Sequence, residues 1–153
     1  MRFGRTSVLS ALFAIGLAGC TVNFLSGYDA KTDEIVTSMQ KAYAAHSLTV
    51  LEGDPQTCPY SANRGYYRQA QLDAGTLLMR AEAIAKNDPT IAQVNDLKQS
   101  LLTLEKLDRL AEGRRACLSG AELAPIDRAN NSIFGAILKL ELAKLRGTPR
   151  PRM

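Results

Sequence analysis

The chain is poor in the residue types from which most catalytic and metal sites are built. Its 153 residues include a single histidine, His46, three cysteines and no tryptophan. A histidine-based catalytic triad would have to use His46, yet no serine or cysteine lies in a recognisable nucleophile turn. The sequence also lacks a glycine-rich phosphate-binding loop. We therefore expect no catalytic site and predict that the protein is not an enzyme.

Acidic residues are missing from the start of the chain, and the first one is Asp29. The chain instead begins with Arg2 and Arg5, followed by an almost entirely apolar run over residues 8–17. A basic head, a short apolar run and small residues at its end are typical of a secretory signal peptide. The run is too short to cross a bilayer, which takes roughly 20 apolar residues. We predict a signal peptide over residues 1–19.

The segment LAGC at residues 17–20 resembles the bacterial lipobox. The resemblance implies that Cys20 is lipidated through a thioether, that cleavage occurs before it, and that the new amino terminus is acylated. Two or three acyl chains hold a protein firmly on a lipid bilayer, because each buried methylene contributes about 0.8 kcal/mol. The alternative is a plain secreted protein in which Cys20 is a free thiol. The residue after the cysteine is Thr21. An aspartate at that position would oppose export to the outer membrane, so its absence favours the outer membrane over the inner one.

Once Cys20 carries lipid, Cys58 and Cys117 remain in a compartment that permits disulfides. The midpoint between them lies in the turn-like segment 86–90. Two antiparallel helices hinged there would bring the two cysteines together, so we predict a disulfide, with two free buried thiols as the alternative. Neither cysteine has a second cysteine or a histidine at ligand spacing, so we expect no metal site.

The composition argues against sheets, because alternating β-branched residues are few and Ala, Leu, Lys, Arg and Glu are abundant. Amphipathic helices are predicted instead, over residues 29–52, 59–86, 88–117 and 125–146. Short connections between them predict an all-α, antiparallel up-down-up-down four-helix bundle. The bundle domain covers residues 29–147; a lipidated cysteine and tether at 20–28 precede it, and a basic disordered tail at 148–153 follows it.

Apolar residues recur at steps of three or four in each predicted helix, which indicates one buried face per helix. In the first predicted helix the face is Ile35, Met39, Ala42, His46 and Thr49, flanked by Val36, Tyr43 and Val50, and in the second it is Tyr67, Ala70, Ala74, Leu77, Ala81 and Ile84. In the third it is Ile91, Val94, Leu97, Leu101, Leu104, Leu107 and Ala111, and in the fourth it is Ile126, Ile133, Phe134, Ile137, Leu138 and Leu140. Ser119 and Glu122 match a capping box. Pro125 would clash inside a helix that began there, so we predict a turn at 119–124 and a helix that starts at Pro125.

His46 lies on the inner face of the first predicted helix and is expected to be a partly buried structural residue. The alternative is a haem ligand, since some helical bundles bind haem iron with one histidine and one methionine. Met39 or Met79 would then be the second ligand, although no C-x-x-C-H attachment site exists. We predict no cofactor.

The segment that contains Tyr60, Arg64, Tyr66 and Arg68 is the most distinctive local cluster. Tyrosine and arginine are favoured at protein interfaces, so these residues form a candidate interaction patch. In the alternative, Tyr67 packs inward while the other four side chains only cover the end of the bundle.

Charged residues near the two ends of the predicted bundle have simple interpretations. Asp29, Asp33 and Glu34 suit the positive end of a helix dipole better than a cation site. Glu141 and Lys144 are expected to form an ordinary ion pair on the surface of the last helix.

The charge of the chain offers little to a nucleic-acid partner. Loss of Arg2 and Arg5 with the signal peptide reduces the net charge from +4 to +2. Basic residues in the tail, Arg150 and Arg152 among them, either touch anionic lipid headgroups or are simply solvated, and we favour solvation. We expect no nucleic acid as a partner outside the cytoplasm.

Beyond the lipobox, the mature chain resembles a group of uncharacterised small proteobacterial lipoproteins. They share a YD-x-x-TD entry to the first helix, which here is Tyr28, Asp29, Thr32 and Asp33, and a C-terminal aliphatic run that contains a glutamate. The resemblance implies a lipid-anchored envelope protein with a helical-bundle body and no known activity.

Together these patterns predict a membrane-anchored periplasmic lipoprotein with a protein-binding or accessory role in the cell envelope. One alternative is a lipoprotein similar to secretin pilots, which would bind an amphipathic helix of its target. Another is a carrier of a small ligand or of haem. The identity of the envelope partner does not follow from the sequence.

Overall fold

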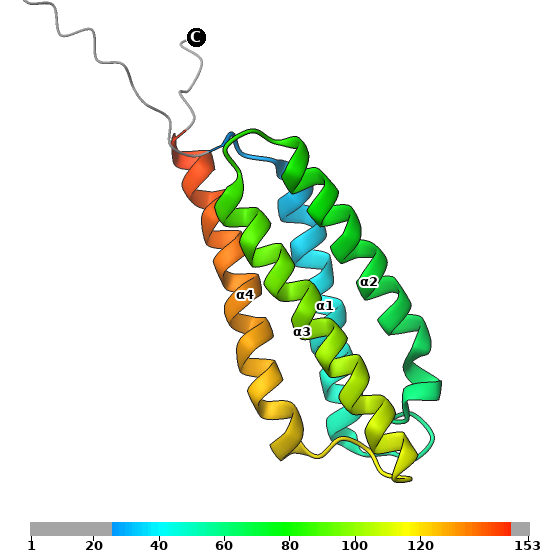
Figure 1. Ribbon diagram of the computed structural model, residues 1–153. Coiled ribbons are helices and arrows are strands. Elements are labelled where there is room, and N and C mark those ends of the chain that lie inside the picture. The colour runs from blue at the N-terminus through cyan, green and yellow to red at the C-terminus, as the bar shows by residue number, and fades with distance from the viewer. Residues whose placement is uncertain (1–25, 148–153) are drawn as a thin grey trace, which may run out of the picture.

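The computed structural model describes residues 26–147, and within this range four helices follow one another along the chain. They are α1 (Ala30–Glu52), α2 (Tyr60–Ala83), α3 (Asp88–Gly113) and α4 (Gly120–Gly147). Each helix packs against the next one, and α4 closes the ring against α1 (Figure 1). The predicted antiparallel up-down-up-down four-helix bundle is confirmed.

The two ends of the bundle carry different parts of the chain. The end that we call the tether end holds Ser26, the turn at 84–87 between α2 and α3, and the last residues of α4 (Figure 1). The opposite or distal end holds the connections 53–59 and 114–119. The chain therefore enters the bundle and leaves α4 at the same end.

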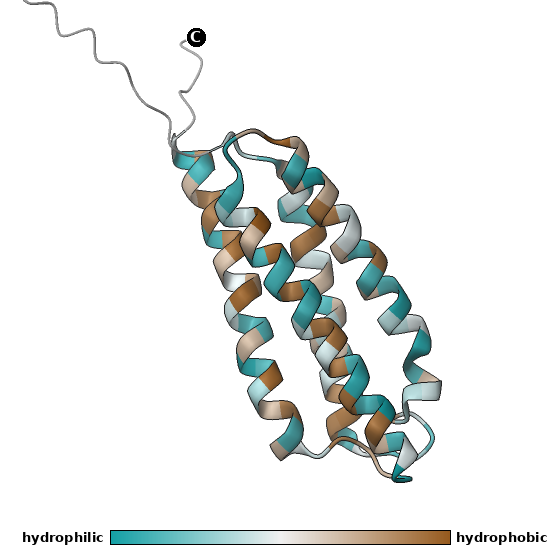
Figure 2. Cartoon of the chain, viewed as in Figure 1, coloured by the Kyte–Doolittle hydropathy of each residue, from teal (hydrophilic) through white to brown (hydrophobic). Residues whose placement is uncertain are grey.

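Hydrophobic residues recur along every helix between hydrophilic ones, as Figure 2 shows, and the buried ones form a single core. Most of the predicted faces of α2 and α3 are confirmed, with Ala74, Leu77 and Leu97 completely buried. Ile84, Ile91 and Leu107 are only half-buried, and Ile84 lies just beyond the end of α2. The small alanines of α2 allow its neighbours to pack closely. In α1 the buried stripe is shifted from the predicted face toward the residues that flank it. Ala42 of the predicted face is exposed, whereas the flanking Tyr43 is buried.

Two helices end earlier than predicted. α2 ends at Ala83 and α3 at Gly113, whereas the sequence pattern extended them to 86 and 117. Lys86 and Arg115 have positive φ angles of 61° and 57°. Arg115 directly follows Arg114, the C-cap of α3, and ends that helix, whereas α2 ends because its C-cap, Ile84, is extended, with φ −101° and ψ 120°. No glycine marks either position in the sequence.

The predicted start of α4 at Pro125 is wrong, because the helix begins at Gly120 and contains Pro125. The capping box supplies the reason. The Ser119 hydroxyl oxygen accepts a hydrogen bond from the Glu122 backbone N–H at 3.3 Å, and a Glu122 carboxylate oxygen accepts one from the Ser119 backbone N–H at 2.9 Å. Leu123, in the first turn, is fully buried, so capping and burial together outweigh the hydrogen bond that Pro125 cannot make.

Within residues 26–147, no helix is both long enough and apolar enough to cross a membrane.

Candidate functional site

Hydrogen bonds to the α2–α3 turn hold the start of the described chain at the tether end. Ser26 is buried, and its hydroxyl donates to the side-chain oxygen of Asn87 at 2.9 Å. Asn87 in turn donates its amide N–H to the Ala81 carbonyl at 2.9 Å. The predicted lipidation residue, Cys20, lies outside the described residues, only six positions before Ser26.

The YD-x-x-TD residues pair with one another where α1 begins. The Tyr28 hydroxyl donates to Asp33 at 3.1 Å, and the Thr32 hydroxyl donates to Asp29 at 2.8 Å. Asp29 caps α1 and also accepts from the Arg80 guanidinium at 2.9 Å. Burial alone would raise the pKa of Asp29, but the hydrogen bonds from Thr32 and Arg80 outweigh it and hold this pKa below its ordinary value. These contacts favour the helix-start interpretation of the acidic residues over a cation site.

Glu141 and Lys144 form a buried ion pair, so the predicted surface pair is wrong. Their side chains are only 1% and 2% exposed. The Lys144 ammonium donates to Glu141 at 2.5 Å, to the Asn87 side-chain oxygen at 2.6 Å and to the Thr90 hydroxyl at 2.9 Å. The other Glu141 oxygen accepts the backbone N–H of Asp29 at 3.2 Å. All three ammonium hydrogens and both carboxylate oxygens are therefore used.

This buried pair joins the three segments that meet at the tether end. Glu141 contacts the start of α1, and Lys144 contacts both the α2–α3 turn and the first turn of α3. The YD-x-x-TD motif and the glutamate of the C-terminal run, which belong to opposite ends of the chain, thus form one hydrogen-bonded network. We call it the entry network.

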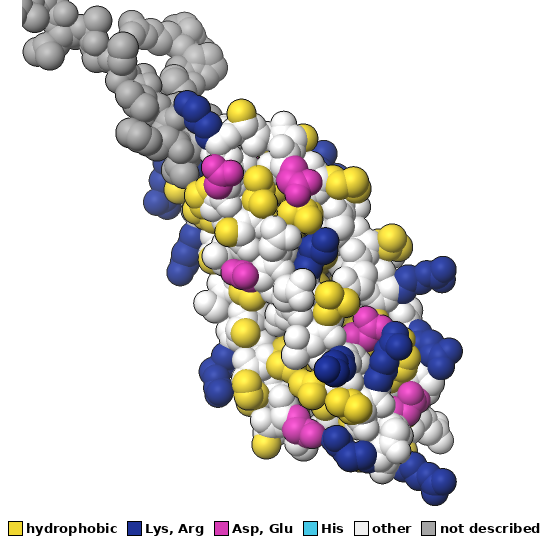
Figure 3. Space-filling view, in the orientation of Figure 1, with side chains coloured by type: hydrophobic (Ala, Val, Ile, Leu, Met, Phe, Trp, Pro, Cys, Tyr) yellow, Lys and Arg dark blue, Asp and Glu magenta, His cyan; other side chains and the backbone are white. Residues whose placement is uncertain are grey.

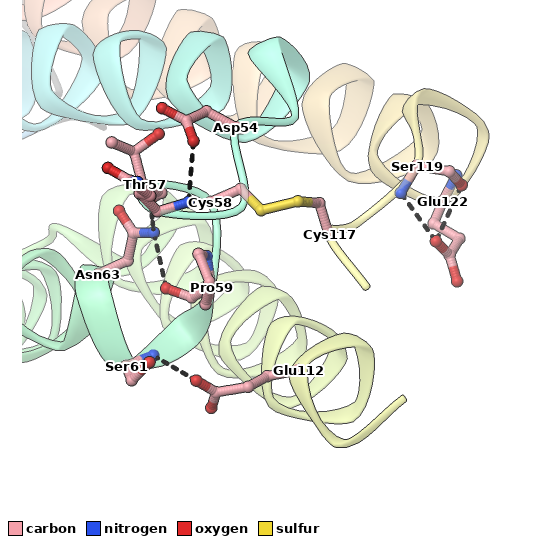
Figure 4. The surroundings of a disulfide bond; sticks show 11 residues. Asp54, Thr57, Cys58, Pro59, Ser61, Asn63, Glu112, Cys117, Ser119 and Glu122 are labelled. Carbon is pink, nitrogen blue, oxygen red and sulfur yellow. Dashed lines mark hydrogen bonds between the residues drawn. A yellow bond between two sulfur atoms is a disulfide. The ribbon is translucent and has the colours of Figure 1, made fainter. Parts of the chain in front are cut away.

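At the distal end, Cys58 and Cys117 form the predicted disulfide, with their Cα atoms 5.6 Å apart. Figure 4 shows that the bond joins the α1–α2 connection to the α3–α4 connection. Cys58 is buried, and its backbone N–H donates to the Asp54 carbonyl at 2.8 Å. Nearby, the backbone N–H of Ser61 donates to Glu112 at 3.1 Å. The disulfide therefore closes the open end of the α2–α3 hairpin.

The only histidine takes part in a buried hydrogen-bond chain across three helices. His46 Nε2 lies 2.9 Å from the Tyr67 hydroxyl, and this hydroxyl donates to Asp108 at 2.9 Å. Because Tyr67 gives its one hydrogen to Asp108, the hydrogen between His46 and Tyr67 must belong to Nε2. The Tyr66 ring stacks on His46 at a centroid distance of 3.9 Å. The structural interpretation of His46 therefore fits its surroundings.

Burial is the main cause of the pKa shifts in this hydrogen-bond chain. It lowers the pKa of His46 to about 4 and raises the pKa of Asp108. Sequence reasoning missed Asp108 as a core residue. The available signal was its position, four residues after Leu104 and three before Ala111, on the buried stripe of α3.

The residues around His46 do not fit a haem. Met79 is 66% exposed and lies on the outside of α2. Met39 is buried, but it stands on the same helix as His46, seven residues and about 10 Å away along the axis. A hollow lined by Met39, Ala42 and Tyr66 holds about 30 Å³, which suits a single water molecule.

The candidate interaction patch is split by the fold. Arg64 and Arg68 are exposed, whereas Tyr66 is turned toward His46 and its hydroxyl oxygen is buried. Tyr60 is half-buried at the boundary between α2 and α3. Proximity in the sequence groups Tyr60 with its neighbours in the chain, but its main partners lie on α3.

Those partners are Arg109 and Glu105. The Arg109 guanidinium lies 4.4 Å from the Tyr60 ring centroid, and Arg64 lies on the same ring at 5.6 Å. The Tyr60 hydroxyl donates to Glu105 at 3.2 Å, and Arg109 forms an ion pair with Glu105 at 2.5 Å. The ring is thus the centre of a fixed arginine cluster that spans two helices.

Comparisons with protein-family models, curated proteins and solved structures found no match to this chain. Over residues 26–147, no group of three or more His, Cys, Asp or Glu side chains is arranged to hold a metal ion. Any statement about function therefore rests on the chain's own residues.

Proposed function

We propose that the protein is a lipoprotein of the bacterial cell envelope, held on the lipid bilayer by acylated Cys20 and facing the periplasm. Its bundle binds another envelope protein in an accessory role and carries out no catalysis. The outer membrane is the favoured location because Thr21, and not aspartate, follows the cysteine.

The observation that carries this proposal is the LAGC segment directly behind a basic head and a short apolar run. Cys20 precedes Ser26 by six residues, which can span roughly 20 Å at most. Ser26 is itself tied to the entry network. An acylated Cys20 would therefore keep the tether end of the bundle close to the membrane.

The buried groups support a role without catalysis. His46, Tyr67 and Asp108 are bound to one another inside the core, where a substrate could not reach them. Glu141 and Lys144 are equally enclosed. A binding role uses the exposed faces of the helices, and Leu102 and Leu110 on α3 are 45% and 50% exposed. These leucines also favour the narrower alternative, a pilot-like lipoprotein that binds an amphipathic helix.

Incorporation of labelled palmitate tests the anchor. We expect the natural chain to incorporate the label and to sediment with membranes, and Cys20→Ser to do neither. The double variant C58S/C117S is the matched control, because it loses two cysteines but keeps the acylation site and should still be labelled. Unlabelled natural protein, or label that persists in C20S, would show that Cys20 is not the anchor.

A further inference from the structure

We propose that the bundle recognises an acidic, amphipathic segment of its partner on a surface formed by α2 and α3 in the distal half of the molecule. This inference rests on the proposed protein-binding function and gives the partner its chemistry. The surface, called here the α2–α3 surface, consists of Tyr60, Arg64, Leu102, Lys106, Arg109 and Leu110.

The apolar part of this surface lies on the outer face of α3. Leu102 and Leu110 are two helical turns apart, and both are about half exposed. Together with Glu105, Lys106 and Arg109 they line a shallow hollow of about 440 Å³. Figure 3 shows hydrophobic and basic side chains gathered over this part of the molecule, with acidic side chains between them. Two leucines at this spacing match the apolar face of an amphipathic helix.

The charged part of the surface has more basic groups than its own acids can balance. Arg64 and Lys106 are exposed, and no carboxylate within residues 26–147 forms an ion pair with either. Glu112 is the second acid beside this surface: hydrogen bonds from Ser61, and to a smaller degree the charge of Arg64, hold the pKa of Glu112 below its ordinary value. Arg68 lies one turn further along α2; it is also exposed and forms no ion pair with a carboxylate of residues 26–147. Glu105 is engaged by Arg109 and Tyr60. The surface therefore favours a partner that brings carboxylates.

The geometry of the arginines favours a protein partner over a membrane. Stacking on Tyr60 holds the Arg109 guanidinium in place, and Arg64 shares the same ring. A guanidinium with a fixed plane suits bidentate recognition of a carboxylate, whereas attraction to lipid headgroups needs only mobile charge. Arg64 also lies 19 residues before Ala83 at the tether end of α2, which is about 28 Å along the axis.

A second copy of this chain fits the surface poorly. A twofold interface would place each surface against itself and would bring Arg64 and Lys106 toward their own copies. Like charges facing one another across an interface oppose association.

The test uses the mature, lipidated, disulfide-bonded protein in neutral detergent micelles and two synthetic helical peptides. Both peptides carry leucine along one face; one has glutamate and the other lysine at the flanking positions. We expect the glutamate peptide to bind and the lysine peptide not to bind, as measured by fluorescence anisotropy. The variant R64E/K106E should weaken binding of the glutamate peptide by about tenfold or more, because two complementary charges become repulsive.

The matched control is K41E/R128E, which makes the same change of charge at exposed positions of α1 and α4. It should alter the affinity by no more than about twofold, since only long-range charge changes. Absence of binding, equal binding of both peptides, or equal weakening by the two double variants would overturn the proposal.

A fluorophore on Thr103→Cys, an exposed position of α3 beside the surface, distinguishes binding of the peptide from binding of the membrane. In phosphatidylcholine vesicles its emission should shift when the glutamate peptide is added, and it should not shift when phosphatidylglycerol replaces part of the lipid. A shift caused by phosphatidylglycerol alone would assign the surface to the membrane and overturn the proposal. Palmitate incorporation is independent of these measurements. If the peptide does not bind but Cys20 is labelled, the proposed surface is wrong and the proposed lipid anchor still holds.

Discussion

Single residues of the entry network determine how firmly the tether end is closed. Lys144 gives one hydrogen each to Glu141, Asn87 and Thr90, and all of these groups are removed from water. A buried ion pair is costly to form but still more costly to break, because the remaining charge has no solvent. The network joins α1, α3 and α4 at this end, so removing one member of the buried pair should cost more stability than removing both.

Lys144→Met should lower the free energy of unfolding by about 3 to 5 kcal/mol, because Glu141 remains buried without its partner. The double change to methionine at 141 and 144 should cost less than the single change. Urea unfolding of the mature chain measures both. Lys31→Met, which breaks the exposed pair with Glu34, is the control and should cost less than about 1 kcal/mol. A double variant that is less stable than K144M would contradict this explanation.

His46 should make the stability depend on pH. Its pKa is about 4 in the folded chain, below the ordinary value of 6.5. As the pH falls below 6.5, the unfolded chain binds the proton first, so stability decreases progressively between pH 6.5 and 4, by about 3 kcal/mol in all. His46→Gln keeps an N–H for Tyr67 but cannot be protonated, so its stability should change less over this interval.

Thermal unfolding at pH 7.0 and pH 4.5 compares the two proteins. Asp108 and Asp127 face this part of the core and remain in both proteins, so the difference in pH dependence isolates the histidine. Identical pH dependence in the natural chain and in H46Q would show that His46 does not titrate in this interval.

Among the elements, α4 shows how local signals compete. The capping box and the buried Leu123 start the helix at Gly120, although Pro125 lies inside it. Pro125→Ala should raise the free energy of unfolding by about 1 kcal/mol, because an alanine N–H can donate to the carbonyl of Ala121. The gain is partly offset by the greater freedom of the unfolded chain. Chemical denaturation measures it, and a loss of stability would contradict the prediction.

The disulfide acts on the α2–α3 hairpin as a unit. It closes a loop with a sequence separation of 59, so C58S/C117S should lower the free energy of unfolding by about 4 kcal/mol in the chain-entropy model. Reduction of the natural chain should give a similar loss in urea, and mass measurement without reductant should find the chain two hydrogen atoms lighter than its reduced form. Equal stability of the oxidised and reduced chains would mean that the bond does not constrain the hairpin.

At the scale of the whole molecule, the proposed anchor would give the bundle a membrane side and a distal side. The 24 residues of α2 extend over about 36 Å, whereas the six steps from Cys20 to Ser26 span roughly 20 Å. An anchored bundle therefore keeps the α2–α3 turn near the headgroups, and the disulfide and the arginine cluster lie further away. The proposed orientation would leave that distal half free for the proposed protein partner.

Spin-labelled headgroups can test this orientation. A fluorophore on Ala85→Cys, in the α2–α3 turn, should be quenched more strongly than one on Ala62→Cys near the distal end of α2. Both alanines are exposed, and the natural cysteines of the described chain are joined in the disulfide. Equal quenching at the two positions would mean that the bundle lies flat on the bilayer.

Three features follow from the amino-acid sequence alone: the number and order of the helices, most of the core faces of α2 and α3, and the pairing of Cys58 with Cys117. These features depend on periodicity and spacing, which are local or follow directly from the hairpin geometry. Three other features depend on how the helices pack: Glu141 and Lys144 are buried, Asp108 lies in the core, and Arg109 lies on the Tyr60 ring. A charged residue is buried only where other segments supply its hydrogen-bond partners, and those partners are 41 to 112 residues away in the chain.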